Sequence, residues 1–451
     1  MNTTERPREG SLEAPTRHPI EWRMPSFYDF DAIEREMERV FDICHGCRRC
    51  FNLCDSFPRL FEMVDASPTG EIDGVAKEDY SAVVEACTLC DMCFMTKCPY
   101  VPPHEWALDF PHLMLRYRAA QLHKEGPGRA QQLAKTDRNG QLARPIAALA
   151  NFASERGNWV TRPIMRTLLG VHEDAELPRY HTDTFSKRAA LEPPRANPEG
   201  KARARAAVLY ATCFVDYNQP STGLAAQAVL AQQGVETEVV YPACCGMPQL
   251  EQGDIAEVAR RAQQVSAALL PYIDAGYDVI TLSASCGLMF KFEWPLILPE
   301  DEGIRRLAAA TRDICEYVVD IAKTEGLTGE LRPVEGGITA HMACHARAQN
   351  MGHKSAEMLR LIPGARVDVV ERCSGHGGTF GIMAETRDLA VKVGRPAARQ
   401  VSLKKNETLC SDCPLACKHL HQMVVDEMPA TGVPPTTRAH PIEIFAKAYG
   451  Y

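Results

Sequence analysis

The sequence contains no run of about eighteen apolar residues, so no segment is expected to span a bilayer as a helix. Its first ten residues, MNTTERPREG, lack the charged and apolar regions of a secretory signal peptide. No long basic cluster occurs and the net formal charge is -8, which argues against nucleic acid as a partner. We therefore expect a cytoplasmic protein whose membrane association, if any, is peripheral, on the cytoplasmic face of the inner membrane.

Several catalytic motifs are also missing. No flavin-binding fingerprint, nucleophile elbow or phosphate loop occurs, and we predict no catalytic residue. The glycines of CSGHGGTFG, around His376, do not follow the G-x-G-x-x-G pattern, and a cysteine begins this segment, so we reject a nucleotide site there. These absences favour an electron carrier over a self-sufficient dehydrogenase, and whether the chain is itself an enzyme stays open.

Cysteine is abundant, with eighteen residues in 451, and two dense runs lie close together. The first run, CHGCRRCFNLC, has the spacing CxxCxxCxxxC, and the second, CTLCDMCFMTKC, has one extra residue before its last cysteine. Thiolates are soft ligands for iron, and three cysteines at i, i+3 and i+6 let a tight loop wrap one 4Fe-4S cubane. Structural zinc and disulfides are the alternatives to two such clusters.

In two-cluster ferredoxins the fourth cysteine of each run binds the other cluster. The expected sets are Cys44, Cys47, Cys50 and Cys98 for the first 4Fe-4S cluster, and Cys87, Cys90, Cys93 and Cys54 for the second. Pro99 follows Cys98 as is usual, whereas Asp55 stands where the first run would often have proline.

The pattern of apolar residues changes along the chain. Residues 29–43 place Ile33, Met37, Val40 and Phe41 on one helical face, and residues 56–65 and 77–87 also favour helices. From residue 206 onward, strand and helix patterns alternate, as in parallel βαβ units. The helical fragments within residues 125–185 are expected to contribute apolar side chains to the core.

We divide the chain into five parts, with the main boundary in the proline-containing basic stretch 187–205. They are a polar tail (1–25), a helical ferredoxin domain with two 4Fe-4S clusters (26–125), a helical connector and linker (126–205), a first cysteine-rich α/β repeat (206–330) and a second (331–451). The fold class is thus α followed by α/β.

The α/β part reads as a duplication. Cys344 follows Cys213 by 131 residues, Cys373 follows Cys244 by 129, and Cys413 follows Cys286 by 127. The candidate ligands fall where predicted strands end, which is where open α/β sheets bind ligands. They are Cys213, Cys244, Cys245 and Cys286 in copy one, and Cys344, Cys373, Cys410 and Cys413 in copy two.

Four further residues lie near these sites. Cys315 is expected to be a buried small hydrophobe. Cys417 is close enough to Cys413 to be a substitute ligand for copy two, although this role is not the favoured one. His345 and His376 sit beside candidate ligands, where they would tune a cluster or move protons, although packing explains them as well.

The paired Cx(n)CCGx(n)CxxC pattern after a two-cluster module resembles the cysteine-rich CCG domains of heterodisulfide reductase subunits and their relatives. CCGMPQLEQGD, HMACHARAQNMG and HPIEIFAKAYG are most similar to the iron-sulfur subunits of anaerobic glycerol-3-phosphate dehydrogenase (its C subunit) and glycolate oxidase. The resemblance implies an electron-transfer subunit that works with an FAD-containing dehydrogenase and a quinone or other acceptor. Ser283 and Ser374 stand where the family has further thiols, which favours one additional cluster over two.

Two other functions remain open. One is an enzyme similar to heterodisulfide reductase, which would reduce a disulfide at a cluster in copy one. The other is an electron donor to a peroxide-detoxifying system.

Overall fold

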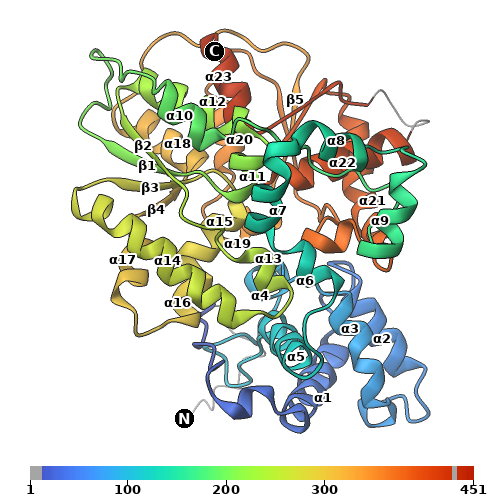
Figure 1. Cartoon of the computed structure of the whole chain (residues 1–451). Coiled ribbons are helices and arrows are strands. Elements are labelled where there is room, and N and C mark those ends of the chain that lie inside the picture. The colour runs from blue at the N-terminus through green and yellow to red at the C-terminus, as the bar shows by residue number, and fades with distance from the viewer. Residues whose placement is uncertain (1–12, 429–433) are drawn as a thin grey trace, which may run out of the picture. The chain divides into compact units, whose positions relative to one another are not determined.

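A computed structural model describes residues 13–428 and 434–451 (Figure 1). Part of the predicted polar tail, residues 1–12, lies outside the described residues. The chain forms two compact units, one made of Met1–Gly126 with Glu251–Ile255 and the other made of Pro127–Leu250 with Ala256–Tyr451. Among the described helices, none combines the length and hydrophobicity that crossing a bilayer requires.

The first unit is helical. Its longest helix, α1, buries the four side chains that the sequence placed on one face, Ile33, Met37, Val40 and Phe41. The Asp29 carboxylate caps the start of α1 by accepting from the Asp31 N–H. Its helices are α1 (Phe30–Cys47), α2 (Ser56–Asp65), α3 (Tyr80–Glu85), α4 (Met92–Thr96) and α5 (Phe110–Glu125), with 3₁₀ turns η1 (Pro25–Tyr28), η2 (Ile72–Gly74) and η3 (Lys77–Asp79).

The second unit contains two four-stranded parallel sheets with the same strand order, β2-β1-β3-β4 and β6-β5-β7-β8. The first sheet is built from β1 (Ala206–Tyr210), β2 (Glu236–Val240), β3 (Asp278–Thr281) and β4 (Thr311–Asp313). The second is built from β5 (Ile338–His341), β6 (Val367–Val370), β7 (Thr408–Ser411) and β8 (Thr437–Ala439). The predicted alternation of strand and helix is therefore observed.

Helices connect and cover these strands. The first after residue 126 are α6 (Arg129–Leu133), α7 (Thr136–Ala143), α8 (Ala147–Ser154), α9 (Thr161–Leu169), α10 (Phe185–Leu191), α11 (Cys213–Tyr217), α12 (Pro220–Gln233), α13 (Met247–Glu251) and α14 (Ile255–Asp274). Then come α15 (Ala284–Leu288), η5 (Met289–Glu293), α16 (Trp294–Ile297), α17 (Glu302–Ala310), α18 (Ile314–Thr324), α19 (Cys344–Ala348), α20 (Lys354–Leu359), η6 (Gly378–Gly381), α21 (Arg387–Lys404), α22 (Pro414–Glu427) and α23 (Pro441–Tyr449). The short 3₁₀ turn η4 (Arg144–Ile146) joins α7 to α8.

One apolar core joins the two sheets of this unit. Leu209 of β1, Ile338 of β5 and Phe445 of α23 belong to the same buried cluster, and α12 packs against α23. The thiol of Cys315 lies in this cluster, which confirms its prediction as a buried hydrophobe. Both sheets thus share their hydrophobic stabilisation.

One expectation about residues 125–185 is wrong. Their apolar side chains were expected in the core, yet Leu149, Phe152, Ile164 and Leu168 are exposed. An amphipathic pattern predicts that one face of a helix is apolar. It does not predict whether that face packs against the core of the same chain.

Candidate functional site

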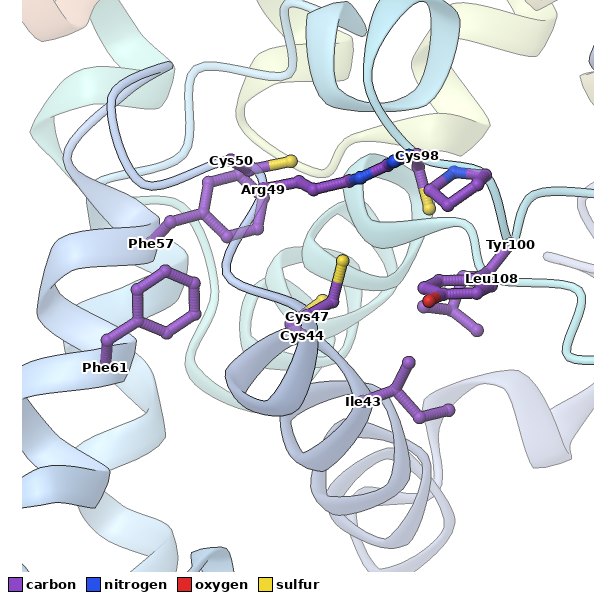
Figure 2. Close-up of a pocket in the computed structure, with 11 residues that line it drawn as sticks. Ile43, Cys44, Cys47, Arg49, Cys50, Phe57, Phe61, Cys98, Tyr100 and Leu108 are labelled. Carbon is purple, nitrogen blue, oxygen red and sulfur yellow. The ribbon is translucent and has the colours of Figure 1, made fainter. Parts of the chain in front are cut away.

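Four thiols gather where α1 ends. Cys44 and Cys47 occupy the last turn of α1, and Arg48, in the left-handed conformation at φ 52°, turns the chain toward Cys50. With Cys98 these cysteines line one cavity, also walled by Phe57, Phe61 and Tyr100 (Figure 2). The structure therefore brings together the whole set predicted for the first 4Fe-4S cluster.

The thiols of this cavity affect one another. Burial, followed by the nearby Cys98, Cys50 and Cys47, raises the pKa of Cys44 well above its ordinary value. Burial, again followed by Cys98, raises the pKa of Cys50 to about 12. Thiolates crowded in this way repel one another unless a cationic centre lies among them.

The second predicted set is also brought together in part. Burial, followed by the nearby thiols of Cys90, Cys87, Cys50 and Cys54, raises the pKa of Cys93 well above its ordinary value. Leu89 and Asp91 adopt positive φ values, 48° and 61°, and bend the loop that carries this run.

Two arginines hold this loop. Arg17 forms an ion pair with Asp91 at 2.7 Å, and its guanidinium lies 4.2 Å from the centre of the Phe94 ring. Buried Arg118 donates to the carbonyl oxygens of Val84, Cys87 and Glu251. Neither arginine was singled out from the sequence, because both contacts depend on the tertiary fold.

The donor chemistry fits clusters better than the alternatives. All eighteen cysteines are free thiols, so the structure contains no disulfide. Within the described residues, no group of three or more His, Cys, Asp or Glu side chains is arranged to hold a single metal ion. Four thiols spread around one cavity suit a larger iron-sulfur centre.

Copy one brings its four thiols together at the carboxyl ends of β1, β2 and β3. The Sγ atoms of Cys213 and Cys244 are 3.6 Å apart, and those of Cys245 and Cys286 are 3.3 Å apart. Hydrogen bonding with Cys213 and then with Cys245 lowers the pKa of Cys244 below its ordinary value. Burial, followed by the charge of the four nearby thiols, raises the pKa of Tyr210 well above its ordinary value. The Tyr210 hydroxyl donates to the Ala243 carbonyl at 2.6 Å.

A polar network supports the adjacent cysteines of this site. The backbone N–H of Cys244 donates to Asp137 Oδ2 at 3.0 Å, and the Tyr241 hydroxyl and the Arg261 guanidinium also donate to Asp137. On the other side, Trp294 Nε1 donates to the Cys245 carbonyl at 3.0 Å. These groups fix the CCG loop without occupying its thiols.

Asp137 belongs to α7, which packs against α11, the helix that begins at Cys213. Gly140 of α7 lies against the Tyr217 ring of α11, where an added Cβ would come within 2.4 Å of the ring. Glycine is therefore required for this close approach.

The candidate thiols of copy two lie in several environments. Cys410 points into the apolar core with Met342, and Cys413 lies in a small cluster with Ala343. Cys373 accepts a hydrogen bond from the Gly375 N–H at 3.4 Å. Cys344, at the start of α19, is half-buried.

Buried histidines occupy the neighbourhood of copy two. His376 and His419 have ring centres 6.0 Å apart, and Arg387 contacts His419 Nδ1 at 2.9 Å. Burial lowers the pKa of His376 to about 4 and that of His419 to about 2, so both are neutral at pH 7. His345 contacts Ser285 of copy one through Nδ1 at 2.9 Å.

Two carboxyl groups are buried between the copies. Burial raises the pKa of Asp313 to about 6, and burial followed by the nearby Asp313 raises the pKa of Asp412 to about 7. The Asp412 carbonyl accepts from the Ala284 N–H at 3.3 Å.

Cys417, which the sequence offered as a substitute ligand, is buried beside β7, and its thiol contacts the Leu409 carbonyl at 3.5 Å.

The parallel sheet and the four-thiol site define a cysteine-rich α/β domain. The family model described as CCG, cysteine-rich domain, matches residues 207–291, which hold all four thiols of copy one. The chain is 32% identical over 189 residues to lactate utilization protein A of Geobacillus kaustophilus, covering 39% of this chain and 73% of that protein. It therefore belongs to the family of cysteine-rich CCG-domain proteins.

Other relatives are subunits of redox enzymes. The C subunit of anaerobic glycerol-3-phosphate dehydrogenase from Escherichia coli K12 is 26% identical over 286 residues, covering 62% of this chain and 69% of that protein. The D subunit of the dihydromethanophenazine:CoB–CoM heterodisulfide reductase from Methanosarcina barkeri is 26% identical over 235 residues, covering 49% and 55%. The predicted resemblance is confirmed, and these names support a role in an oxidoreductase.

Proposed function

We propose that the chain is an iron-sulfur electron-transfer subunit of an oxidoreductase, which receives electrons from an FAD-containing dehydrogenase subunit and passes them to a quinone or another acceptor. The convergence of four thiols in copy one carries this proposal. The two cysteine runs of the first unit support it, because one complete predicted set lines a single cavity.

Each cluster is assigned to one set of thiols. Cys44, Cys47, Cys50 and Cys98 would hold the first 4Fe-4S cluster, and Cys87, Cys90, Cys93 and Cys54 the second. Cys213, Cys244, Cys245 and Cys286 would hold one further cluster. Such clusters supply one-electron transfer when bound.

Copy two receives no cluster in this proposal. Cys410 is buried within the apolar core, and Ser374 stands where the family has a further thiol. We infer that copy two arose by duplication and serves as the scaffold that packs against copy one.

Metal content tests these assignments. Iron and acid-labile sulfide would be measured on anaerobically purified full-length protein, with low-temperature EPR of the reduced and oxidised forms. We expect about twelve irons per chain, falling to about eight in Cys245→Ala, while the matched control Cys410→Ala keeps about twelve. About eight irons in the unaltered protein would contradict the third cluster.

A disulfide reductase is the second candidate function. The adjacent pair Cys244 and Cys245 favours it, whereas both thiols are buried and Ser283 replaces a thiol beside them. Turnover of a disulfide with a reduced dye by the cluster-loaded chain would establish this activity. No turnover, with all irons present, would leave electron transfer as the function.

A further inference from the structure

Exposed apolar side chains gather on the segment that contains α7, α8 and α9, helices labelled in Figure 1. Leu142 lies near the end of α7 and Ile146 in η4, while Leu149 and Phe152, three residues apart, form an apolar stripe on one face of α8. Such a stripe ordinarily faces a core, yet Leu142 is 65% exposed and Phe152 is 64% exposed. These side chains are available to a partner.

A second stripe continues the surface on α9. Val160, Ile164 and Leu168 are four residues apart and all are exposed, Leu168 to 67%. Trp159, between the two helices, is 85% exposed. We call the exposed apolar side chains of residues 142–169 the apolar surface.

The backbone beneath this surface is tightly held. Arg162 is buried and donates to the carbonyl oxygens of Ser154, His172, Glu173 and Ala175. The Thr161 hydroxyl donates to the Ala153 carbonyl at 2.5 Å, and α8 packs against α9. The exposure of the stripes is therefore a property of a fixed helical pair.

The segment that carries the stripes has a net positive charge. Residues 138–170 carry five arginines and one glutamate, a formal charge of +4, in a chain whose net formal charge is -8. Arg138, Arg144, Arg156 and Arg166 are exposed. Of these, Arg156 pairs with Asp426 at 2.8 Å and Arg166 with Glu173 at 3.5 Å. Basic side chains bordering exposed Trp, Phe and Leu are typical of helices that lie in a membrane interface.

We propose that the apolar surface binds a lipid bilayer that contains anionic lipids, with α8 and α9 lying on the membrane. Burial of the two stripes in the acyl boundary supplies the apolar part of the binding free energy. The arginines contact lipid phosphates and add an electrostatic part that salt weakens.

A second copy of this chain fits the surface less well. A two-fold contact would bring the same arginines of both copies together, and like charges oppose association. A protein partner with an apolar patch is the other occupant, and the test below separates it from lipid.

The surface is directly connected to copy one. Leu142 lies on α7, five residues after Asp137, whose carboxylate accepts from the Cys244 N–H. At 1.5 Å per residue this separation is about 8 Å along the helix. Bilayer binding would thus bring the four-thiol site toward a membrane-soluble acceptor, a consequence that rests on the proposed function, whereas lipid binding itself does not.

Vesicle flotation of the full chain tests the proposal. Vesicles of phosphatidylcholine alone and of phosphatidylcholine with phosphatidylglycerol would be compared at low and high salt. We expect the protein to float with the phosphatidylglycerol vesicles at low salt. The variant Leu149→Gln/Phe152→Gln/Trp159→Gln should lower the bound fraction about tenfold or more, because three large apolar side chains are removed.

Two further variants sharpen the result. Leu191→Gln, at a leucine that is 72% exposed on α10, is the matched control and should bind like the unaltered protein. Arg144→Glu/Arg166→Glu should remove the preference for phosphatidylglycerol. Circular dichroism and iron content, unchanged in every variant, show that folding and the clusters are intact.

Some outcomes would overturn the proposal. If the unaltered protein floats with neither vesicle, or if the triple variant floats as well as the control, lipid is not the occupant. If the triple variant loses binding to a dehydrogenase subunit while no form binds vesicles, the surface is a protein interface. Iron content that fails to reach twelve would instead contradict the proposed function and leave the lipid result unaffected.

Discussion

The backbone N–H of Cys244 donates a 3.0 Å hydrogen bond to the carboxylate of Asp137, although the two residues are 107 positions apart. The same carboxylate accepts from the Tyr241 hydroxyl and pairs with Arg261. One side chain of α7 therefore fixes the loop that presents two adjacent thiols.

Asp137→Ala is expected to destabilise this loop. It leaves the Cys244 N–H and the Tyr241 hydroxyl without their acceptor, and it removes one of the two carboxylates that pair with Arg261. These losses should lower the free energy of unfolding by about 2 to 3 kcal/mol. Asp137→Asn should cost less, since its amide oxygen still accepts from Cys244. Urea unfolding followed by circular dichroism measures both.

A matched control removes a different carboxylate. Asp183 forms an exposed ion pair with Lys187, and Asp183→Ala should leave the unfolding midpoint unchanged. Equal losses in Asp137→Ala and Asp183→Ala would show that the Asp137 network contributes nothing particular.

Gly375 and Gly364 form a second test pair. Both have positive φ, 74° and 69°, but a Cβ at Gly375 would lie 2.0 Å from the Ala390 carbonyl oxygen, whereas nothing lies within 4 Å at Gly364. Gly364→Ala should cost about 1 kcal/mol for its backbone conformation, and Gly375→Ala about 3 kcal/mol or more because the chain must also move. Thermal unfolding compares the two, and similar melting temperatures would contradict the predicted overlap.

His341 is expected to make stability depend on pH. Its Nδ1 contacts the Ser411 hydroxyl at 2.9 Å and its Nε2 contacts the Arg372 carbonyl at 3.0 Å, and burial lowers the pKa of His341 to about 4. Between about pH 6.5 and pH 4 the unfolded chain binds a proton that the folded chain does not, so stability falls as the pH falls.

The His341→Gln variant isolates this contribution. The free energy of unfolding of the unaltered protein should include a loss of about 3 kcal/mol from this residue between about pH 7 and pH 4, and the variant should lack it. Urea titrations at several pH values measure the slope. The same slope in both proteins would mean that His341 is protonated when folded.

The sequence was informative where neighbours in the chain are neighbours in space. The apolar period of residues 29–43 placed Ile33, Met37, Val40 and Phe41 on the face of α1 that is buried. The helix runs further than this pattern, to Cys47, so Cys44 and Cys47 lie on its last turn. The alternation of apolar strands and helices likewise predicted the parallel sheets.

Long-range relationships were not predictable in this way. All four residues of β7 are buried, so a two-residue period could not show that Cys410 faces the core. The contact between Asp137 and Cys244 depends on how α7 docks. The stretch 187–205 has the composition of a linker, yet Gly200 packs against the backbone of Gly234.

The close packing of Gly140 against Tyr217 also has a consequence for amide exchange. Because α7 contacts α11 through this glycine and the CCG loop through Asp137, the helix can detach only when both contacts break. The amide protons of α7 and of Cys244 should then exchange with deuterium at one common rate, set by a single opening event. An isotope-exchange experiment would therefore detect ligand binding at the thiols as slower exchange along the whole of α7.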